Sequence, residues 1–420
     1  MFIEKHAWWK VLSCALFALA VLTPNAVAQD VPPKTETPQE IFERALRERA
    51  RGDLHQAIRS FHAILNGNPG LNRARLELAV AYYQAMDHGA ALEQARRVLA
   101  DPATPPAVRA NVQRLVAQIE AEAEPHRFGG TASVGLLYDS NVSAGPSTPG
   151  LSLDPSAVKR SDSALTVTLG SSHRYLSKMR PGIGGRDGAL LWQSQALVSQ
   201  IAYRNESDFD LQVVTLTTGP AWISPPRLRA LAPLQFDRLN LGGNHYLDIL
   251  GMSPAVVLGR LEDLEVQLDA QLQKRAYRRQ IDAGRDSRYR SFGLQAGRIL
   301  SGMTLQAGAR LNSDNADDDN WDYRGTEWFG LVAGPLIRRT TGYLRFSYLR
   351  SVYDQPDPGS GIGRTDRETR WALGASYRFG AGTDEPWSAN LTLLEIDHRS
   401  DVPFYAFDRR QLSLTLTRSF

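Results

Sequence analysis

Two different hydrophobic periods divide the chain. Residues 37–120 place apolar side chains every three to four positions, which is typical of amphipathic helices. Residues 128–420 alternate apolar and polar positions, with clusters of Gly, Pro, Asn and Asp between the alternating stretches, and this pattern predicts strands. The period changes within residues 121–127, where we expect a linker. The sequence therefore predicts an all-α region followed by a long β region.

The helical region repeats itself with a period of 34 residues. Ala45 and Ala79 form one such pair, and Ala57 and Ala91 form another. This period is typical of tetratricopeptide repeats, in which small residues let neighbouring helices approach closely. A helical bundle with accidental spacing is the alternative. In the repeat interpretation, three residues would face the concave groove, but the sequence favours the simpler explanation that they are ordinary solvated helix residues. These residues are Arg49, Tyr83 and Gln84.

The β region contains fourteen alternating stretches, an even number, as expected for a barrel made by one chain. Residues 264–273 alternate without error, so that one face suits hydrocarbon and the other suits water. We therefore predict a 14-stranded antiparallel transmembrane β-barrel over residues 128–420. The polar positions of residues 264–273 are predicted to line its lumen, unless they only form a structural hydrogen-bond network. They are Glu265, Gln267, Asp269, Gln271 and Gln273.

The lengths of the links between strands indicate an orientation. Links after odd-numbered strands are mostly long and links after even-numbered strands mostly short, as in outer-membrane barrels with short periplasmic turns. Residues 204–208 and 177–187 are exceptions, one a short odd link and the other a long even one. Both ends of the barrel domain would then face the periplasm. The last strand alternates up to a terminal aromatic, as expected of a barrel signal presented to the assembly machinery; its key residues are Leu416 and Phe420.

The N-terminal residues 1–28 are predicted to be an export signal. Lys5 and Lys10 precede an apolar stretch, and Ala26-Val27-Ala28 fits the small-residue cleavage site. The single cysteine, Cys14, lies inside this segment, so the mature chain would have no thiol for a disulfide, for catalysis or for a metal. We therefore expect a protein of the bacterial outer membrane, with the helical region in the periplasm.

Charge and motifs argue against several functions. The net charge of +3 gives no bulk attraction to nucleic acid. The sequence lacks the hydrolase, zinc-protease and phosphate-loop motifs, and His173 alternates with its neighbouring serines, which places them on opposite faces of a strand. The acidic run from Asp314 to Asp322 lacks the pattern of a calcium loop, so we expect a solvated surface loop there. An external loop is also expected to begin with Lys274, Arg275, Arg278 and Arg279. We expect no enzymatic activity, cofactor or metal.

The first predicted strand carries a recognisable motif, Gly135-Leu136-Leu137-Tyr138-Asp139-Ser140-Asn141-Val142. With the helical head and the terminal Phe420, it resembles the surface lipoprotein assembly modulator family of outer-membrane translocators, also called type 11 secretion systems. The resemblance implies a barrel that delivers a surface lipoprotein or secreted protein to the cell surface. Its partners would be outer-membrane lipid, this client and a periplasmic chaperone. A passive channel or a polysaccharide-export porin is the alternative. The motif residues that carry the resemblance are Tyr138, Asp139, Ser140 and Asn141.

Overall fold

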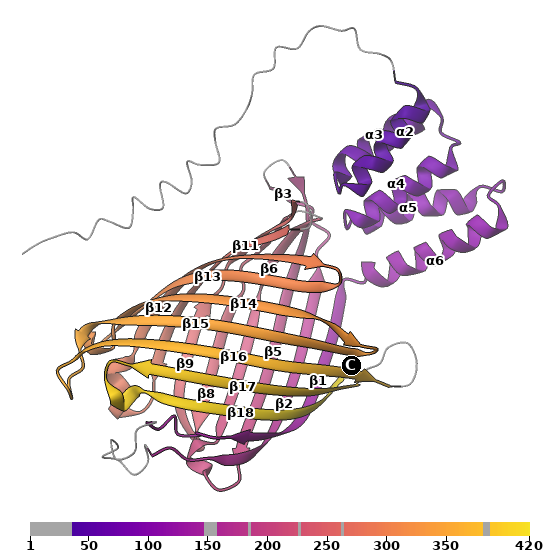
Figure 1. Cartoon of the computed structure of the whole chain (residues 1–420). Coiled ribbons are helices and arrows are strands. Elements are labelled where there is room, and N and C mark those ends of the chain that lie inside the picture. Colours follow the sequence, from indigo (N-terminus) through magenta and orange to yellow (C-terminus); the bar gives the residue numbers. More distant parts are fainter. Residues whose placement is uncertain (1–35, 147–157, 184–185, 226–227, 262–263, 381–386) are drawn as a thin grey trace, which may run out of the picture.

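The computed structural model describes residues 36–146, 158–183, 186–225, 228–261, 264–380 and 387–420 (Figure 1). The predicted export signal, residues 1–28, lies outside the described residues. A helical region stands at one end of a large β-barrel, and the C-terminus lies at that same end of the barrel. We call this end of the barrel the helix end and the opposite end the loop end.

The helical region consists of five helices, each packed against the next along the chain. The capping box of Thr37 and Glu40 begins the first helix. Ala45, Ala57 and Ala79 have no exposed surface, so the small residues of the 34-residue period lie where helices meet. None of the described helices is long and apolar enough to cross a membrane. The tetratricopeptide assignment stays a prediction. The helices are α2 (Pro38–Ala50), α3 (Leu54–Gly67), α4 (Asn72–Gln84), α5 (His88–Ala100) and α6 (Pro106–Ala123).

The connection between the two parts is shorter than the sequence predicts. Helix α6 ends at Ala123 and strand β1 begins at His126, so that Glu124 and Pro125 alone separate them. The predicted linker over 121–127 is wrong in extent. No helix breaker precedes Pro125, and the backbone beyond it pairs at once with the second strand. The helical region is therefore held on a short connection.

One antiparallel sheet makes up the barrel wall, and a separate hairpin of β3 (Gly182–Ile183) and β4 (Arg186–Asp187) lies at its helix end. The wall strands are β1 (His126–Asp139), β2 (Asp162–Leu176), β5 (Ala189–Tyr203), β6 (Leu211–Ser224), β7 (Leu228–Leu231), β8 (Leu234–Leu241), β9 (Asn244–Met252), β10 (Ala255–Leu261), β11 (Leu264–Tyr277), β12 (Ser287–Leu300), β13 (Met303–Ala316), β14 (Tyr323–Ile337), β15 (Thr340–Pro356), β16 (Gly363–Phe379), β17 (Trp387–Ser400) and β18 (Phe407–Ser419).

These sixteen segments form fourteen barrel strands, which confirms the predicted number. Segments β7 and β8 both pair with β6, and β9 and β10 both pair with β11, so each pair is one strand with a break. The breaks fall at Pro233 and Pro254, which have no N–H to donate to a ladder. Hydrogen bonds nevertheless cross this level, from Ala232 N to Pro220 O at 3.1 Å and from Ser253 N to Pro233 O at 3.0 Å.

The barrel closes where β1 pairs with β18, from Thr131 opposite Ser419 to Asp139 opposite Gln411. Strand β1 also pairs with β2 over its whole length. Every strand of the wall therefore has two neighbours, and no edge is left open.

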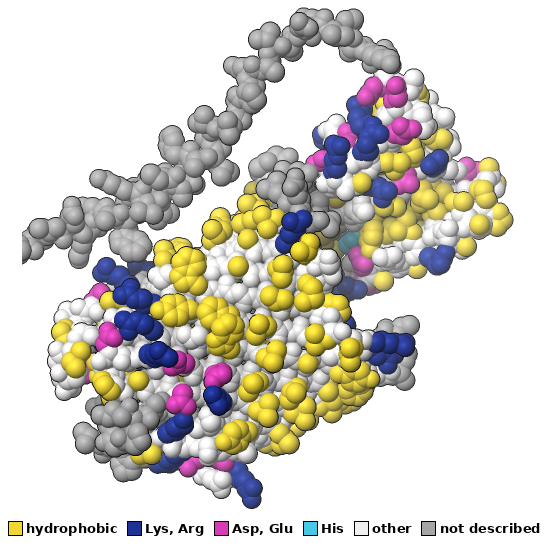
Figure 2. All heavy atoms as spheres, viewed as in Figure 1, with side chains coloured by type: hydrophobic (Ala, Val, Ile, Leu, Met, Phe, Trp, Pro, Cys, Tyr) yellow, Lys and Arg dark blue, Asp and Glu magenta, His cyan; other side chains and the backbone are white. Residues whose placement is uncertain are grey.

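Strand alternation gives the wall two chemically different faces. Large apolar side chains are exposed on one face, as for Leu136 (65% exposed) and Leu268 (51% exposed). On the other face, side chains reach across an intervening strand. Tyr203 of β5, for example, donates to Asp139 of β1 at 3.0 Å, across β2. Such contacts identify the concave side, because side chains converge there. The apolar face is therefore the outer one, and Figure 2 shows apolar side chains spread over it.

The two ends of the barrel differ as the link lengths predict. The links at the loop end carry η2 (Ser207–Phe209), η3 (Gln280–Arg285), η4 (Asp319–Trp321) and η5 (Pro403–Tyr405), whereas most links at the helix end are short turns. The exception is the link between Leu176 and Ala189, which contains β3 and β4 and lies beside the helical region (Figure 1).

Candidate functional site: the closure, the lumen and the inner mouth

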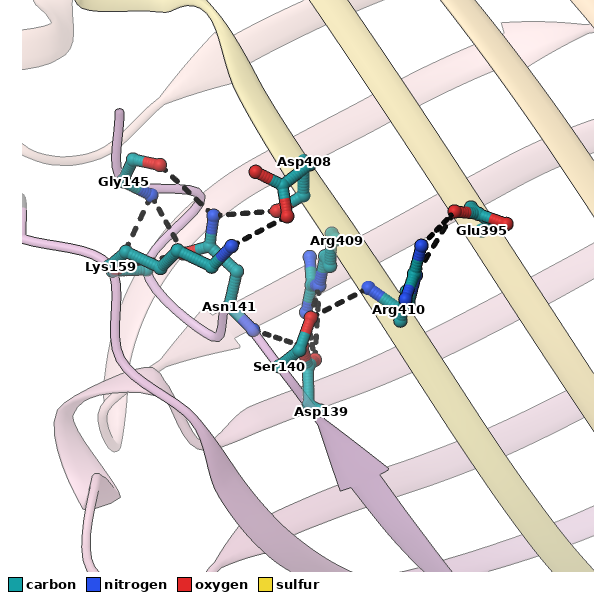
Figure 3. Close-up of polar contacts among 10 residues, drawn as sticks. Asp139, Ser140, Asn141, Gly145, Lys159, Glu395, Asp408, Arg409 and Arg410 are labelled. Atoms are coloured by element: carbon teal, nitrogen blue, oxygen red, sulfur yellow. Dashed lines mark hydrogen bonds and ion pairs between the residues drawn. The ribbon is translucent and has the colours of Figure 1, made fainter. Parts of the chain in front are cut away.

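The strand-one motif lies at the closure of the barrel, at the loop end (Figure 3). Asp139 has no exposed surface. Its carboxylate accepts from Arg409 Nε at 3.0 Å, from Gln411 Nε2 at 2.6 Å and from the Tyr203 hydroxyl at 3.0 Å. It also accepts from the backbone N–H of Asn141 at 3.0 Å. One buried carboxylate thus connects the first strand, the last strand and β5.

The next two residues of the motif hold the same joint through backbone groups. Ser140 N donates to Arg410 O at 2.9 Å, and Ser140 Oγ accepts from Arg410 N at 2.8 Å. Asn141 Nδ2 donates to the carbonyls of Asp408 at 2.9 Å and Gly145 at 3.0 Å (Figure 3). We call the contacts of residues 139–141 the closure clamp. All its polar groups are used within the chain, so the motif positions strands.

Tyr138 of the strand-one motif and the predicted C-terminal signal lie on the outer face. Tyr138 is half exposed there, and Leu416 lies opposite Val134 of β1. Phe420 extends the closure by one residue, because its N–H donates to Gly130 O at 2.9 Å. Its ring is 70% exposed. The predicted C-terminal signal therefore completes the seam of the barrel.

The predicted lumen residues of β11 share the concave face with polar groups of other strands. Asp269 accepts from Arg310 of β13 at 3.3 Å, and the same guanidinium donates to Glu327 of β14 at 3.1 Å. Gln273 accepts from Arg275 at 3.3 Å. Gln267 donates to Asp269 at 3.4 Å, so three of the predicted residues take part in hydrogen bonds on this face, a fourth shares the face by strand phase, and the fifth, at the helix end, forms an ion pair. The three are Gln267, Asp269 and Gln273, the fourth is Gln271, and the fifth is Glu265.

Two of the expected loops begin later in the chain than the sequence suggests. Arg275 lies in β11 and Asp314 in β13, and the two form an ion pair at 2.7 Å across β12. The sequence suggested loops because both side chains are charged and lie next to further charges. The missed signal is their phase, since each has the alternation of the polar face of its own strand.

At the loop end, the charges of the inner face are paired. Arg364 stacks on the rings of Tyr353 and Tyr405, with its guanidinium 4.1 and 3.5 Å from their centroids, and pairs with Asp366 at 2.6 Å. His398 lies between Asp366, at 3.5 Å, and the carboxylate of Glu368, at 3.1 Å. Arginine can satisfy a carboxylate and an aromatic face at once. In this part of the lumen, ion pairs and stacking contacts therefore join the polar side chains of neighbouring strands.

The helical region contacts the opening of the barrel at the helix end, which we call the inner mouth, through the turn between α4 and α5. Met86 packs against a buried apolar cluster of the barrel that includes Leu176, Leu191 and Ala221. Leu191 and Ala221 lie opposite each other in the register of β5 and β6, and they belong to the concave face. Met86 has a φ of +61°, a left-handed conformation that costs a non-glycine residue about 1 kcal/mol. The turn is thus held against the lumen side of the rim.

The long link at the helix end takes part in this contact. Arg180, in that link, donates to the backbone carbonyl of Met86. The carbonyl of the adjacent Pro181 accepts from Trp222 Nε1 of β6 at 2.9 Å. This link departs from the rule of short turns because it joins the helical region to the barrel wall. We call the contacts of Met86, Arg180 and the apolar cluster the docking contact.

His88, two residues after Met86, is the group through which we expect pH to act on the docking contact. Its ring is buried, and burial together with the nearby guanidinium of Arg180 lowers its pKa below the ordinary 6.5. Arg174 acts in the same direction, whereas the carboxylates of Glu122 and Asp87 oppose it. The docked state therefore binds fewer protons than an undocked state in which His88 titrates normally, so docking is strongest above pH 6.5 and weakens below it.

We expect acid to separate the helical region from the rim. Spin labels on cysteines introduced at Gln84 and Lys178, in a chain carrying Cys14→Ser, should show a single distance at pH 8 and a broader, longer distribution at pH 5.5. His88→Gln should remove most of this pH dependence, because no proton can then be taken up at that position. His62→Gln is the matched control, since His62 is exposed on α3. A distribution that is unchanged at pH 5.5 would contradict the prediction.

The three predicted groove residues differ in their surroundings. Arg49 pairs with Glu77 at 3.0 Å, which joins α2 to α4. The hydroxyl of Tyr83 donates to Glu122 of α6 at 2.7 Å. Gln84 is exposed. Two of the three side chains are thus engaged inside the helical region.

Comparisons with known proteins identify no family. No family model matches the chain, and no curated protein matches it. Among solved structures, the outer membrane protein OprD from Pseudomonas aeruginosa is 11% identical, with 71% of this chain and 94% of that chain covered and a TM-score of 0.38. An anion-selective porin from Comamonas acidovorans is 10% identical, with 70% and 99% covered and a TM-score of 0.38. OccAB4 from Acinetobacter baumannii is 8% identical, with 71% and 99% covered and a TM-score of 0.35.

These similarities are too distant to transfer a function. The resemblance of the strand-one motif to surface lipoprotein assembly modulators has no counterpart in a family match. The account of function therefore depends on the geometry of this chain.

Proposed function

We propose that the barrel spans the bacterial outer membrane, with the helical region in the periplasm. The outer face supports this location, since exposed leucines such as Leu294, Leu373 and Leu414 lie on strands around the wall. Contact of this apolar area with water would cost about 25 cal/mol of free energy for each Å². Lipid removes that cost, and the closed strand order leaves no backbone edge unpaired in hydrocarbon. Short turns at the helix end support a periplasmic helical region.

We further propose that the protein is a translocator that passes a protein client, a surface lipoprotein or a secreted protein, from the periplasm to the cell surface. The observation that carries this proposal is the docking contact, by which Met86 holds the helical region against the lumen side of the inner mouth. A passive pore needs no such appendage. A client, or the chaperone that brings it, would reach the helices before it reaches the lumen, while the assembly machinery would act on the closing strand.

The test of this proposal is surface display. Deletion of the gene should abolish protease-accessible display of a co-encoded client and leave its periplasmic pool intact. The wild-type gene should restore display, and Arg410→Gln, a change on the outer surface, should restore it equally. Unchanged display in the deletion strain would overturn the proposal.

A second candidate is an export channel for a polysaccharide or small polar solutes. One observation favours it: many inner-face positions away from the loop end carry neutral hydroxyl groups, such as Ser133 and Thr417, whose side chains meet at 2.9 Å, and Thr168 and Ser199, at 3.1 Å. Steady conductance in planar bilayers together with normal client display would favour this candidate over translocation.

A further inference from the structure

Charges on the inner face are distributed unevenly along the barrel. At the loop end and in the middle, guanidinium groups are held by carboxylates, as in the pairs of Arg364, Arg310 and Arg275. Glu265, near the helix end, is likewise held by Arg229 at 2.8 Å. The arginines in these contacts thus add little net charge to the lumen.

Three other arginines of the inner face make no ion pair with any described residue. Arg378 lies one residue from the helix end of β16 and Arg345 further along the neighbouring β15. Arg127 lies one residue from the start of β1, at the same end. All three side chains are exposed. We call them the free arginines.

Strand phase places the free arginines on the concave face. Arg345 is two residues from Tyr343, whose hydroxyl meets Thr392 of β17 across β16, at 2.9 Å. Arg378 has the phase of Glu368, whose carboxylate meets His398 of the same face. The pairing of both strands continues without a shift between these positions.

The register also shows that the free arginines are spread along the barrel wall from the helix end toward its middle. Arg345 lies opposite Ala372, which is six residues along β16 from Arg378. At roughly 3.3 Å for each residue, the two guanidinium groups are attached on the order of 20 Å apart along the wall. Arg370, paired with Glu368 at 2.5 Å and half exposed, follows two residues beyond Ala372. The third free arginine, Arg127, lies on β1 opposite Arg174 in the register with β2.

Arg174 is partly buried and lies near both Arg127, which repels it, and Glu122 of the helical region, whose carboxylate compensates part of its charge. Asp237, in the middle of the inner face, is held by the neutral donors Thr215, at 2.7 Å, and Gln235, at 2.6 Å. The excess of positive charge is thus confined to the helix end of the lumen.

We propose that the helix-end half of the lumen is a binding path for anionic groups, so that the barrel selects anionic material from the side of the helical region. Exposed guanidinium groups in a passage with low-dielectric walls concentrate anions and repel cations. They also match carboxylate and phosphate groups by bidentate hydrogen bonds. This inference deepens the proposed function, because a protein client would enter through an acidic segment, but it depends only on the lumen and not on client display.

The test uses the full chain in planar bilayers under a tenfold KCl gradient. The wild-type barrel should pass chloride in preference to potassium, by about threefold or more. The triple variant Arg127→Gln, Arg345→Gln and Arg378→Gln should lower this ratio to near one. The double variant Arg229→Gln and Glu265→Gln is the matched control, since it removes one charge of each sign at the same end and should leave the ratio unchanged. Equal permeability of the two ions in the wild-type barrel would overturn the inference.

If the docked helices close the barrel to ions, a binding measurement tests the inference instead. Labelled decaglutamate should bind the detergent-solubilised full chain, measured by fluorescence anisotropy, and the triple variant should bind it at least tenfold more weakly. Decalysine should not bind. Equal binding of decaglutamate by the wild-type chain and the triple variant would also overturn the inference. Anion preference with normal client display in the deletion strain would instead retain it and refute translocation.

Discussion

Replacement of Asp139 by alanine should destabilise the barrel more than any other single change in its wall. The substitution removes the carboxylate that accepts from Arg409, Gln411 and Tyr203, and it leaves Arg409 without its counter-charge in a largely buried position. Breaking a buried ion pair from one side costs about 3–5 kcal/mol. We expect this loss in urea unfolding of the micelle-bound protein, together with loss of the compact band in unheated gel electrophoresis.

The neighbouring pair supplies the matched control for this prediction. Arg410 follows Arg409 in the sequence but points to the outer face, where it pairs with Glu395 at 2.8 Å (Figure 3). Their side chains are 70% and 48% exposed. Exposed ion pairs contribute only about 0–1 kcal/mol, so Arg410→Gln should unfold almost as the wild-type protein does. If Asp139→Ala proved no more harmful than Arg410→Gln, the closure clamp would not be what holds β1 to β18.

Replacement of Met86 by aspartate should release the helical region from the inner mouth. The side chain would lose roughly 1.5–3 kcal/mol of apolar burial. It would also bring a carboxylate among Leu176, Leu191 and Ala221, which have no donor for it, and the carboxylate would compete with the Met86 carbonyl for Arg180. Together these effects exceed about 3 kcal/mol. The spin-label pair at positions 84 and 178 should report a broad, lengthened distance at pH 8, which the wild-type chain would reach only in acid.

Met86→Leu separates packing from other effects of changing this turn. Leucine preserves the apolar volume and meets the same backbone strain at φ +61°, so its cost should stay below about 1.5 kcal/mol. Barrel unfolding should be unaffected in both variants, since Met86 belongs to the helical region. A wild-type distance distribution in Met86→Asp would show that other contacts hold the helices at the mouth.

The docking prediction also bears on translocation. If the helical region must be held at the mouth to deliver a client, Met86→Asp should reduce client display while leaving the barrel folded. A pH-labile contact at His88 would then regulate delivery as the periplasm acidifies. Normal display by Met86→Asp would favour the channel interpretation.

Much of the fold follows from local patterns. The alternating residues 264–273 begin at the first residue of β11 and lie wholly within it, and the predicted number of strands is confirmed. Alternation is a property of neighbouring residues, so it can be recognised in the sequence before the partner strand is known. The link lengths likewise separate the loop end from the helix end. The sequence could not show that Arg275 and Asp314 are strand residues, because their charge also suits a loop.

The sequence by itself determined that a helical region precedes fourteen strands with one apolar and one polar face, because helical and strand periods are written in consecutive side chains. Only the tertiary structure decided which distant side chains meet. Asp139 finds Arg409 some 270 positions away, Met86 finds Leu191 on the rim, and Arg345 finds no partner among the described residues. Such contacts depend on barrel closure and register, which bring distant strands together and which no local pattern encodes.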